Sequence, residues 1–240
     1  MLLLCAVFFT PLPFTACSPH SLWCSTAYAF TSSGGPGGFF ILLLITGLCY
    51  ASSADTLKEK GIVFLKSVVS LIVFFGVLAF VNERYTKPIL KSQRPSHVYM
   101  LNQTGLTGAI DSLYQLDKNT RKIFFETLVK THPLQFQQID PEIQAHWIEE
   151  AGFSFPSGHT FNAFLFAMIL AYAIYFNRSY PALRKLFLIP FVWALLVGIS
   201  RVAMGAHTAY DVCAGAALGI LLGALFLYID RTRHWLTRKN

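Results

Sequence analysis

The stretch PSGHTFNAFLFAMILAYAIYF, residues 156–176, passes from polar loop residues into an apolar run within four positions. Proline suits the first turn of a helix, and Gly158 allows a ligand to approach the backbone closely. From Thr160 onward the residues are almost all apolar, and a helix that crosses a membrane needs about 20 such residues. The stretch therefore predicts a membrane-spanning helix whose first turn carries two polar side chains, Ser157 and His159.

The composition of the whole chain indicates the same class of protein. Of its 240 residues, 54% are hydrophobic and 13% are charged, and the mean hydropathy is +0.50; a soluble domain carries about 25% charged residues. Five further apolar runs are long enough to be spans: 2–19, 39–54, 61–81, 186–204 and 212–229. We therefore expect an all-α integral membrane protein, a bundle of six transmembrane helices.

The chain is expected to divide into three parts. Residues 1–81 hold the first three spans, residues 82–155 form a small helical extracytoplasmic segment, and residues 156–240 hold the last three spans. The run at 2–19 is the weakest span, because it is short and contains Pro11 and Pro13. It can also be interpreted as a signal peptide, but no basic residue precedes it, so we prefer an uncleaved helix.

Residues 21–33 are less apolar than the predicted spans and end in the sequence GGPGG at 34–38. This pattern predicts an interfacial or re-entrant helix that stops at the glycines. Cys17 and Cys24 flank the beginning of this helix. They can pair in an oxidising compartment, although a helix between them would keep them apart, and we prefer the unpaired interpretation.

Lysine and arginine occur at alternate ends of the predicted spans. They are present in the loops 52–60 and 177–185 and in the tail after residue 229, whereas the connections 17–38 and 205–211 contain none. Positively charged short loops face the cytoplasm. We therefore expect both termini inside, and residues 82–155 outside together with the beginning of the fourth span and the connection between the last two.

The segment 82–155 reads as a series of short helices. One covers 117–131, and another begins at Asp140-Pro141, because aspartate caps a helix and proline fits its first turn. Ile143, Trp147 and Ile148 share one face of this second helix, which we expect to rest on the membrane surface. The segment either caps a site or is a plain connector, and the sequence leaves both interpretations open.

The last block of polar residues combines a histidine with an aspartate. Residues four apart on a helix share a face, so Asp211 is expected to accept the Nδ1–H of His207 and to leave Nε2 free as a nucleophile for phosphorus. Arg201 has no acidic neighbour in sequence. It either binds a phosphate through its guanidinium or extends to the membrane interface, which terminal arginines commonly do.

Two earlier blocks add to this set. Lys87 and Arg94 lie seven residues apart, nearly two helical turns, and are expected on one face. Ser157 and the Gly158 N–H offer an anion site at a helix start, and His159 can give a proton to a leaving oxygen. Singly, each block also fits a basic flank, a helix cap or an interfacial histidine. Their joint occurrence on one side of a membrane instead favours a phosphate carried by a lipid.

Together these blocks resemble the three-part signature of the type 2 phosphatidic acid phosphatase superfamily. The matching residues are Lys87-x6-Arg94-Pro95, Pro156-Ser157-Gly158-His159 and Ser200-Arg201-x5-His207-x3-Asp211. The run HWIEEAGFSFP at 146–156 and the six-span layout resemble the bacterial members that act on phosphatidylglycerophosphate. The sequence departs from them at its N-terminus, which lacks basic residues before the first span.

This resemblance implies a phosphatase of the bacterial inner membrane with its site facing the periplasm. His207 would be the nucleophile, Asp211 would orient it, and His159 would be the acid and base. Lys87, Arg94, Ser157, Gly158 and Arg201 would hold the phosphate. No metal, no other cofactor, no nucleic acid and no obligate protein partner are expected.

Phosphatidylglycerophosphate is the favoured substrate. Undecaprenyl pyrophosphate, phosphatidic acid, lysophosphatidic acid and diacylglycerol pyrophosphate are further candidates. A dedicated undecaprenyl-pyrophosphate phosphatase, a lipid A phosphatase or phosphotransferase, and a non-catalytic lipid-phosphate binding or transport protein remain as alternatives.

Overall fold

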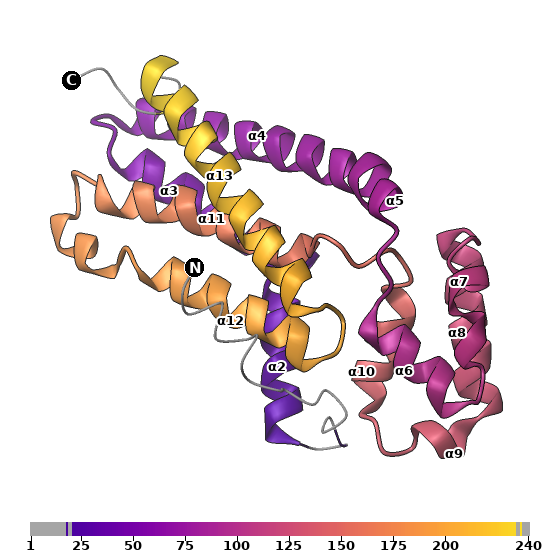
Figure 1. Ribbon diagram of the computed structural model, residues 1–240. Helices are drawn as coiled ribbons and strands as arrows, with labels where there is room; N and C mark the ends of the chain where they lie inside the picture. The colour runs from indigo at the N-terminus through magenta and orange to yellow at the C-terminus, as the bar shows by residue number, and fades with distance from the viewer. Residues whose placement is uncertain (1–17, 19–20, 234–235, 237–240) are drawn as a thin grey trace.

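The computed structural model describes residues 18, 21–233 and 236, and every regular element in this part of the chain is helical (Figure 1). The longer helices are α2 (Leu22–Ser33), α3 (Pro36–Ser52), α4 (Leu57–Val81), α6 (Pro95–Gln103), α8 (Lys118–Thr131), α10 (Pro141–Glu149), α11 (Gly158–Tyr175), α12 (Ile189–Ala203) and α13 (Ala209–Arg233). The shorter helical elements are a π turn (Asn82–Thr86), α5 (Lys87–Leu90), a 3-10 turn (Thr107–Ala109), α7 (Ile110–Leu113), α9 (Pro133–Phe136) and a second 3-10 turn (Pro181–Leu186).

Four stretches of the described chain are long and apolar enough to cross a membrane: Leu57–Leu90, Gly158–Tyr175, Pro181–Ala203 and Ala209–Thr232. The pair α2 and α3 makes a fifth if it is counted as one span broken by a bend of 56°. The all-helical membrane fold is thus confirmed. The predicted span at 2–19 and Cys17, one partner of the possible Cys17–Cys24 pair, lie outside the described residues, so the count of six spans and the pairing stay predictions.

The glycine-rich sequence at 34–38 separates α2 from α3, as the sequence predicts. A Cβ atom on Gly38 would lie 1.7 Å from the carbonyl oxygen of Ser33, so the bend needs a glycine at this position. Pro36 opens α3 at a position where its missing N–H costs nothing. On the far side of the bend, α2 packs along α12, and Thr31 Oγ1 lies 2.8 Å from Ser200 Oγ.

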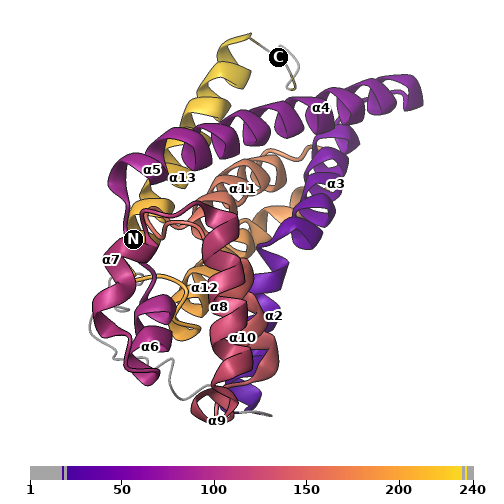
Figure 2. The ribbon, with the colours of Figure 1, turned by 90° about the vertical axis from the view of Figure 1, so that its right-hand side faces the viewer.

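Helix α11 lies in the middle of the apolar bundle and packs against α3, α12 and α13 (Figures 1 and 2). The sequence Gly215-x3-Gly219-x3-Gly223 makes the contact of α13 with α11 possible. A Cβ at Gly215 would lie 2.6 Å from Ser157 O, and one at Gly219 would lie 2.4 Å from the next turn of α11. Small residues at this spacing let membrane helices approach closely. The approach brings the two helix starts together, and Ser157 N donates to Asp211 O at 3.0 Å.

The elements α6 to α10 form a compact group at one end of the bundle (Figure 2). Asp117 caps α8. Asp140 caps α10, with Pro141 in the first turn, as predicted. The expectation that Ile143 and Trp147 rest on the membrane surface is wrong. Both are 1% exposed and belong to a core of their own, because the other short helices offer them an apolar partner. Trp147 Nε1 donates to the carbonyl oxygen of Met204 at 2.6 Å, which fixes this group to the end of α12.

Candidate functional site

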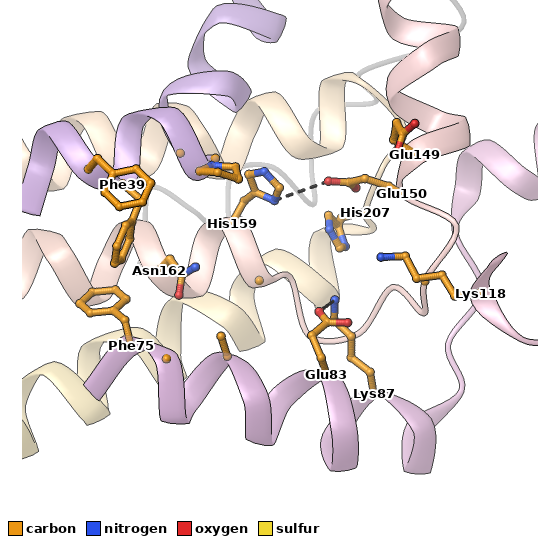
Figure 3. A pocket seen from close by; sticks show the side chains of 18 of the residues that line it. Phe39, Phe75, Glu83, Lys87, Lys118, Glu149, Glu150, His159, Asn162 and His207 are labelled. Atoms are coloured by element: carbon orange, nitrogen blue, oxygen red, sulfur yellow. Dashed lines mark hydrogen bonds and ion pairs between the residues drawn. The ribbon is translucent and has the colours of Figure 1, made fainter. Parts of the chain in front are cut away.

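A cavity of about 560 Å³ opens where the end of α4 meets the start of α11 (Figure 3). Its apolar wall includes Phe39, Phe40, Ile72, Phe75, Gly76 and Ala79 from α3 and α4. Its charged wall includes Glu83, Lys87, Arg94, Lys118, Glu149, Glu150, His159 and His207. The volume is in the range of sites for small molecules. All three sequence blocks reach this one cavity, although they are far apart along the chain.

Lys87 and Arg94 both line the cavity, but they do not lie on one helical face as expected. Helix α5 ends at Leu90, the next residue Lys91 has a left-handed backbone with φ of 46°, and Arg94 is the residue that precedes α6. The chain turns between the two cations, because Pro95 begins a new helix and cannot continue the old one. Lys87 forms an ion pair with Glu83 one turn earlier on the same helical stretch (Figure 3).

The guanidinium of Arg94 is held on several sides. Its Nη1 donates to Glu150 Oε2 and to the carbonyl oxygen of Ala206, both at 2.8 Å, and lies 3.3 Å from His207 Nε2. Its Nε donates to the carbonyl oxygen of Gly152 at 3.0 Å. Arg94 is therefore fixed against the nucleophile candidate, and it joins the first sequence block to the third.

His207 and Asp211 do not share a helical face as predicted, since His207 lies in the turn before α13. Thr208 and Asp211 cap this helix reciprocally: Thr208 N donates to Asp211 Oδ2 at 2.7 Å and Asp211 N donates to Thr208 Oγ1 at 3.2 Å. His207 Nδ1 and Asp211 Oδ2 lie 3.5 Å apart. Ser154, which our sequence interpretation gave no role, lies between them: its Oγ is 3.1 Å from His207 Nδ1 and hydrogen-bonds to Asp211 Oδ2.

The surroundings of His207 keep its ring neutral. Burial, followed by the positive charges of Arg94 and Arg201, lowers the pKa of His207 to about 3, although the nearby Asp211 carboxylate acts to raise it. An arginine can only donate hydrogen bonds, so the contact with Arg94 requires an unprotonated Nε2. The site thus presents a neutral imidazole whose free nitrogen faces a cation, which suits attack on an electrophile with anionic oxygens.

The second block begins α11 as expected. Ser157 caps the helix: its Oγ accepts from Thr160 N at 3.4 Å and lies 3.0 Å from Thr160 Oγ1. Ser157 is fully buried and is not among the residues that line the cavity, so its role in phosphate binding stays a prediction. Gly158 and His159 do line the cavity, and the His159 side chain points toward Glu150 across it (Figure 3).

Glu150 is the principal residue that our interpretation of the sequence missed. Its carboxylate contacts Arg94 at 2.8 Å, forms an ion pair with Arg201, and lies 3.6 Å from His159 Nδ1 and 3.5 Å from His146 Nε2. Burial raises the pKa of Glu150, but Arg201 and Arg94 outweigh it and hold the pKa well below its usual range. The sequence signal was the run at 146–156, which we cited for its resemblance without assigning roles to its residues.

Arg201 contradicts one interpretation of its sequence position, the extension to the membrane interface, and its role in binding phosphate stays a prediction. It is 0% exposed, so it does not extend to the interface, and it has an acidic partner, Glu150, from a distant part of the chain. Its Nη1 lies 2.8 Å from His146 Nε2. Its Nε has no acceptor within the described part of the protein. A buried donor without a partner is uncommon, and an oxygen of a bound anion would satisfy it.

The cavity therefore combines two histidines, the cations Lys87, Arg94 and Lys118, and an apolar wall. Arg201 does not line the cavity, but it forms an ion pair with Glu150, which does. Cations that surround a free imidazole nitrogen can neutralise the oxygens of a phosphoryl group while the nitrogen attacks phosphorus. In the described residues, no three His, Cys, Asp or Glu side chains are grouped as ligands of a metal ion. Whether the chemistry is independent of metals stays a prediction.

Comparisons with known proteins identify relatives of this chain. The family model of the PAP2 superfamily matches residues 64–235. Phosphatidylglycerophosphatase B of Bacillus subtilis is 39% identical over 88 residues, which are 36% of this chain and 43% of that protein. The Escherichia coli protein of the same name is 25% identical over 195 residues, which are 81% of this chain and 70% of that one. The Haemophilus influenzae protein is 32% identical over 58% of this chain and 56% of its own.

A solved structure has the same fold. The crystal structure of a transmembrane PAP2 type phosphatidylglycerolphosphate phosphatase from Bacillus subtilis superposes with a TM-score of 0.55, covers 96% of this chain and 92% of its own, and is 21% identical. At this level of identity the likeness shows the fold alone. Together with the apolar helices, it identifies this chain as a membrane protein.

Proposed function

Because the chain belongs to the PAP2 superfamily, we propose that it is a membrane lipid phosphatase that releases inorganic phosphate through a phosphohistidine intermediate. The observation that carries the proposal is the cavity with two unlike walls. A neutral histidine stands beside the buried Arg94 on one wall, and aromatic and aliphatic side chains cover the other. A substrate with a phosphate head and an apolar tail matches both walls at once.

In the first step, His207 Nε2 attacks phosphorus, a P–N bond forms, and the bond from phosphorus to the lipid oxygen breaks. Arg94, Arg201 and Lys87 neutralise the non-bridging oxygens, with the Gly158 N–H at the start of α11. His159 gives its proton to the lipid oxygen as that oxygen leaves. Asp211 holds His207 in the tautomer that keeps Nε2 free.

In the second step, water attacks the phosphorus of phosphohistidine on the side opposite the P–N bond. His159, which has lost its proton, takes one from this water, and phosphate leaves as the nitrogen recovers its electron pair. The histidine that served as acid thus serves as base, and the enzyme returns to its starting protonation. No residue outside the set described above is needed for this cycle.

The apolar wall supports the choice of a lipid. Phe39 and Phe75 face the cavity opposite the charged residues (Figure 3), and the outer surfaces of α3 and α4 expose apolar residues such as Ile41 and Leu65. An acyl chain can therefore lie against the helices while the phosphate reaches the cations. We propose phosphatidylglycerophosphate as the preferred substrate, since relatives that are 25 to 39% identical to this chain are named phosphatidylglycerophosphatase B.

The proposed location is the bacterial inner membrane, with both termini in the cytoplasm and the cavity facing the periplasm. The distribution of lysine and arginine between the loops supports this orientation. An outward-facing site would also give access to undecaprenyl pyrophosphate, and the lipid phosphates named above remain candidates. Nucleic acid and an obligate protein partner have no part in the proposal.

Phosphate release by the purified protein in detergent tests the proposal. The panel contains phosphatidylglycerophosphate, phosphatidic acid, lysophosphatidic acid, diacylglycerol pyrophosphate and undecaprenyl pyrophosphate, each with and without EDTA. We expect release in both conditions, with phosphatidylglycerophosphate turned over most efficiently. Binding without release from any of these lipids would indicate a binding or transport protein and would overturn the proposal. Loss of phosphate release in the presence of EDTA would contradict the metal-independent mechanism.

A further inference from the structure

Ser154 lies in the connection between α10 and α11 and is 0% exposed. Its Oγ is 3.1 Å from His207 Nδ1 and within hydrogen-bond distance of Asp211 Oδ2. The direct separation of His207 Nδ1 and Asp211 Oδ2 is 3.5 Å, which is longer than an ordinary N–H···O hydrogen bond. The serine hydroxyl is therefore nearer to both groups than they are to each other.

The hydrogen atoms can be assigned from the partners. Arg94 Nη1 lies 3.3 Å from His207 Nε2 and can only donate, so Nε2 is an acceptor and the single ring proton is on Nδ1. Asp211 is ionised and can only accept, so the serine hydroxyl donates its one hydrogen to Asp211. A lone pair of Ser154 Oγ is then free to accept the Nδ1–H. The three groups make one continuous chain, from imidazole to hydroxyl to carboxylate.

The backbone fixes the hydroxyl in this position. Ser154 N donates to the carbonyl oxygen of Ser92 at 2.8 Å, and Arg94 Nε donates to the carbonyl oxygen of Gly152 at 3.0 Å. The other end of the chain is held by Thr208 N, which donates to Asp211 Oδ2 at 2.7 Å. The residues that place Ser154 thus come from the first sequence block, and those that place Asp211 come from the third.

We propose that Ser154 is a positioning residue through which Asp211 acts on His207. This inference rests on the proposed function, in which His207 Nε2 forms a bond to phosphorus. As that bond forms, the ring gains positive charge and the Nδ1–H bond to Ser154 Oγ strengthens. The serine hydroxyl becomes a better donor to Asp211 in turn. No proton leaves its atom in this step: Nδ1 keeps its hydrogen, and so does the hydroxyl.

A double-mutant cycle tests the proposal, using Ser154→Ala, Asp211→Asn and the variant with both changes. We expect Ser154→Ala to lower kcat by about 10- to 100-fold, the loss typical of a hydrogen bond to a charged group, with little change in KM. Asp211→Asn should lower kcat at least as much. Because both changes break the same chain, the double variant should be about as slow as the slower single variant. Effects that multiply would show that Asp211 acts without the serine and would overturn the proposal.

Ser96→Ala is the matched control. Ser96 is also fully buried, it lies two residues after Arg94 at the start of α6, and its hydroxyl has no hydrogen-bond partner among the residues that the structure describes. Removing this hydroxyl should leave kcat and KM near those of the unchanged protein. A loss of kcat in Ser96→Ala equal to that in Ser154→Ala would indicate a general effect of packing and would count against the relay.

A spectroscopic measurement keeps the proposal testable if Ser154→Ala does not fold. The ring nitrogens of ¹⁵N-histidine report which one carries the proton, and comparison with His207→Gln assigns the signals of His207. In the unchanged protein at neutral pH, we expect a protonated Nδ1 and an unprotonated Nε2. A proton on Nε2 would overturn the proposal. Failure of the proposed function is distinguishable, because it would abolish phosphate release in the unchanged protein without changing this tautomer.

Discussion

The two histidines of the cavity are held very differently. His207 has a side chain that is 1% exposed, and both its ring nitrogens have partners at 3.1 and 3.3 Å. His159 is 23% exposed on its side chain, and its contact with Glu150 is longer, at 3.6 Å. The difference suits the two roles, because a nucleophile must be fixed on the line of attack. A general acid and base must instead reach first a leaving oxygen and then a water molecule.

The largest effect is expected from His207→Ala, which removes the atom that bonds to phosphorus. We expect phosphate release to fall by at least about 10⁴-fold, in the range found when a catalytic nucleophile is deleted. The measurement is phosphate release from lipid phosphates in detergent, with protein whose melting temperature matches the unchanged chain. Phosphate release near the normal rate would show that His207, the more tightly held histidine, is not the nucleophile.

His159→Ala should have a smaller effect, because only proton transfer is lost. We expect kcat to fall by about 10²- to 10⁴-fold with a lipid substrate. An aryl phosphate, such as p-nitrophenyl phosphate, has a leaving oxygen that departs without protonation, so its phosphorylation step should suffer much less. Measuring both substrates separates the acid from the nucleophile. Equal losses for the lipid and the aryl phosphate in a pre-steady-state burst would contradict the role of His159 as the acid.

Glu150 joins the two histidine regions, and its neutralisation should act mainly on binding. The carboxylate contacts Arg94 and Arg201, the groups that we propose for the phosphate oxygens, so an incoming phosphate competes with it. Glu150→Gln keeps the shape and removes the charge. We expect the inhibition constant of inorganic phosphate to fall by about tenfold, which corresponds to about 1.4 kcal/mol of binding free energy.

Glu142→Gln is a suitable control for this variant, because Glu142 is an exposed residue at the beginning of the same helix, α10. Its inhibition constant should equal that of the unchanged protein. If phosphate inhibited Glu150→Gln more weakly than the unchanged protein, the carboxylate would be a support for the arginines and not their competing ligand.

The sequence predicted which blocks meet but not how each residue is held. Apolar runs and loop charges indicate the spans from local composition, and the three blocks reach one cavity because α4, α11, α12 and α13 bring their ends to the same place. The prediction that His207 and Asp211 share a helical face was wrong, because Thr208 caps α13 and His207 lies before this cap. The start of a helix can shift by a few residues without a change in the apolar pattern of the sequence.

The partners of the buried charged residues could not be predicted from short stretches of sequence, for a different reason. Glu150 lies 51 residues from Arg201 and 56 from Arg94 along the chain, and a glutamate beside Glu149 in a polar segment reads as a solvated residue. Ser154 lies 53 residues from His207. These contacts depend on how the group α6 to α10 docks on the bundle, and tertiary packing, which no short pattern contains, determines that.

The smallest effect for any one residue concerns stability in mild acid, and it follows from histidines that the fold keeps neutral. Burial lowers the pKa of His207 to about 3, with Arg94 adding to it, and burial with the Arg201 charge lowers that of His146 to about 4. Burial likewise lowers the pKa of His97 to about 3. A histidine in the unfolded chain has a pKa of about 6.5. At pH values between that pKa and the lower pKa values of the folded protein, the unfolded chain binds more protons than the folded one.

Stability should therefore fall as the pH falls from about 7 to about 5.5, by about 1 kcal/mol for each of these histidines. Glu150 should not add to this loss, because its depressed pKa keeps its contribution intact until the pH drops below the usual range of a glutamate. The check is the melting temperature of the purified protein in detergent across this range. A melting temperature that rose toward pH 5.5 would mean that one or more of these histidines gains a proton in the fold. If that histidine were His207, the contrast between a fixed, neutral nucleophile and a more exposed acid would be lost.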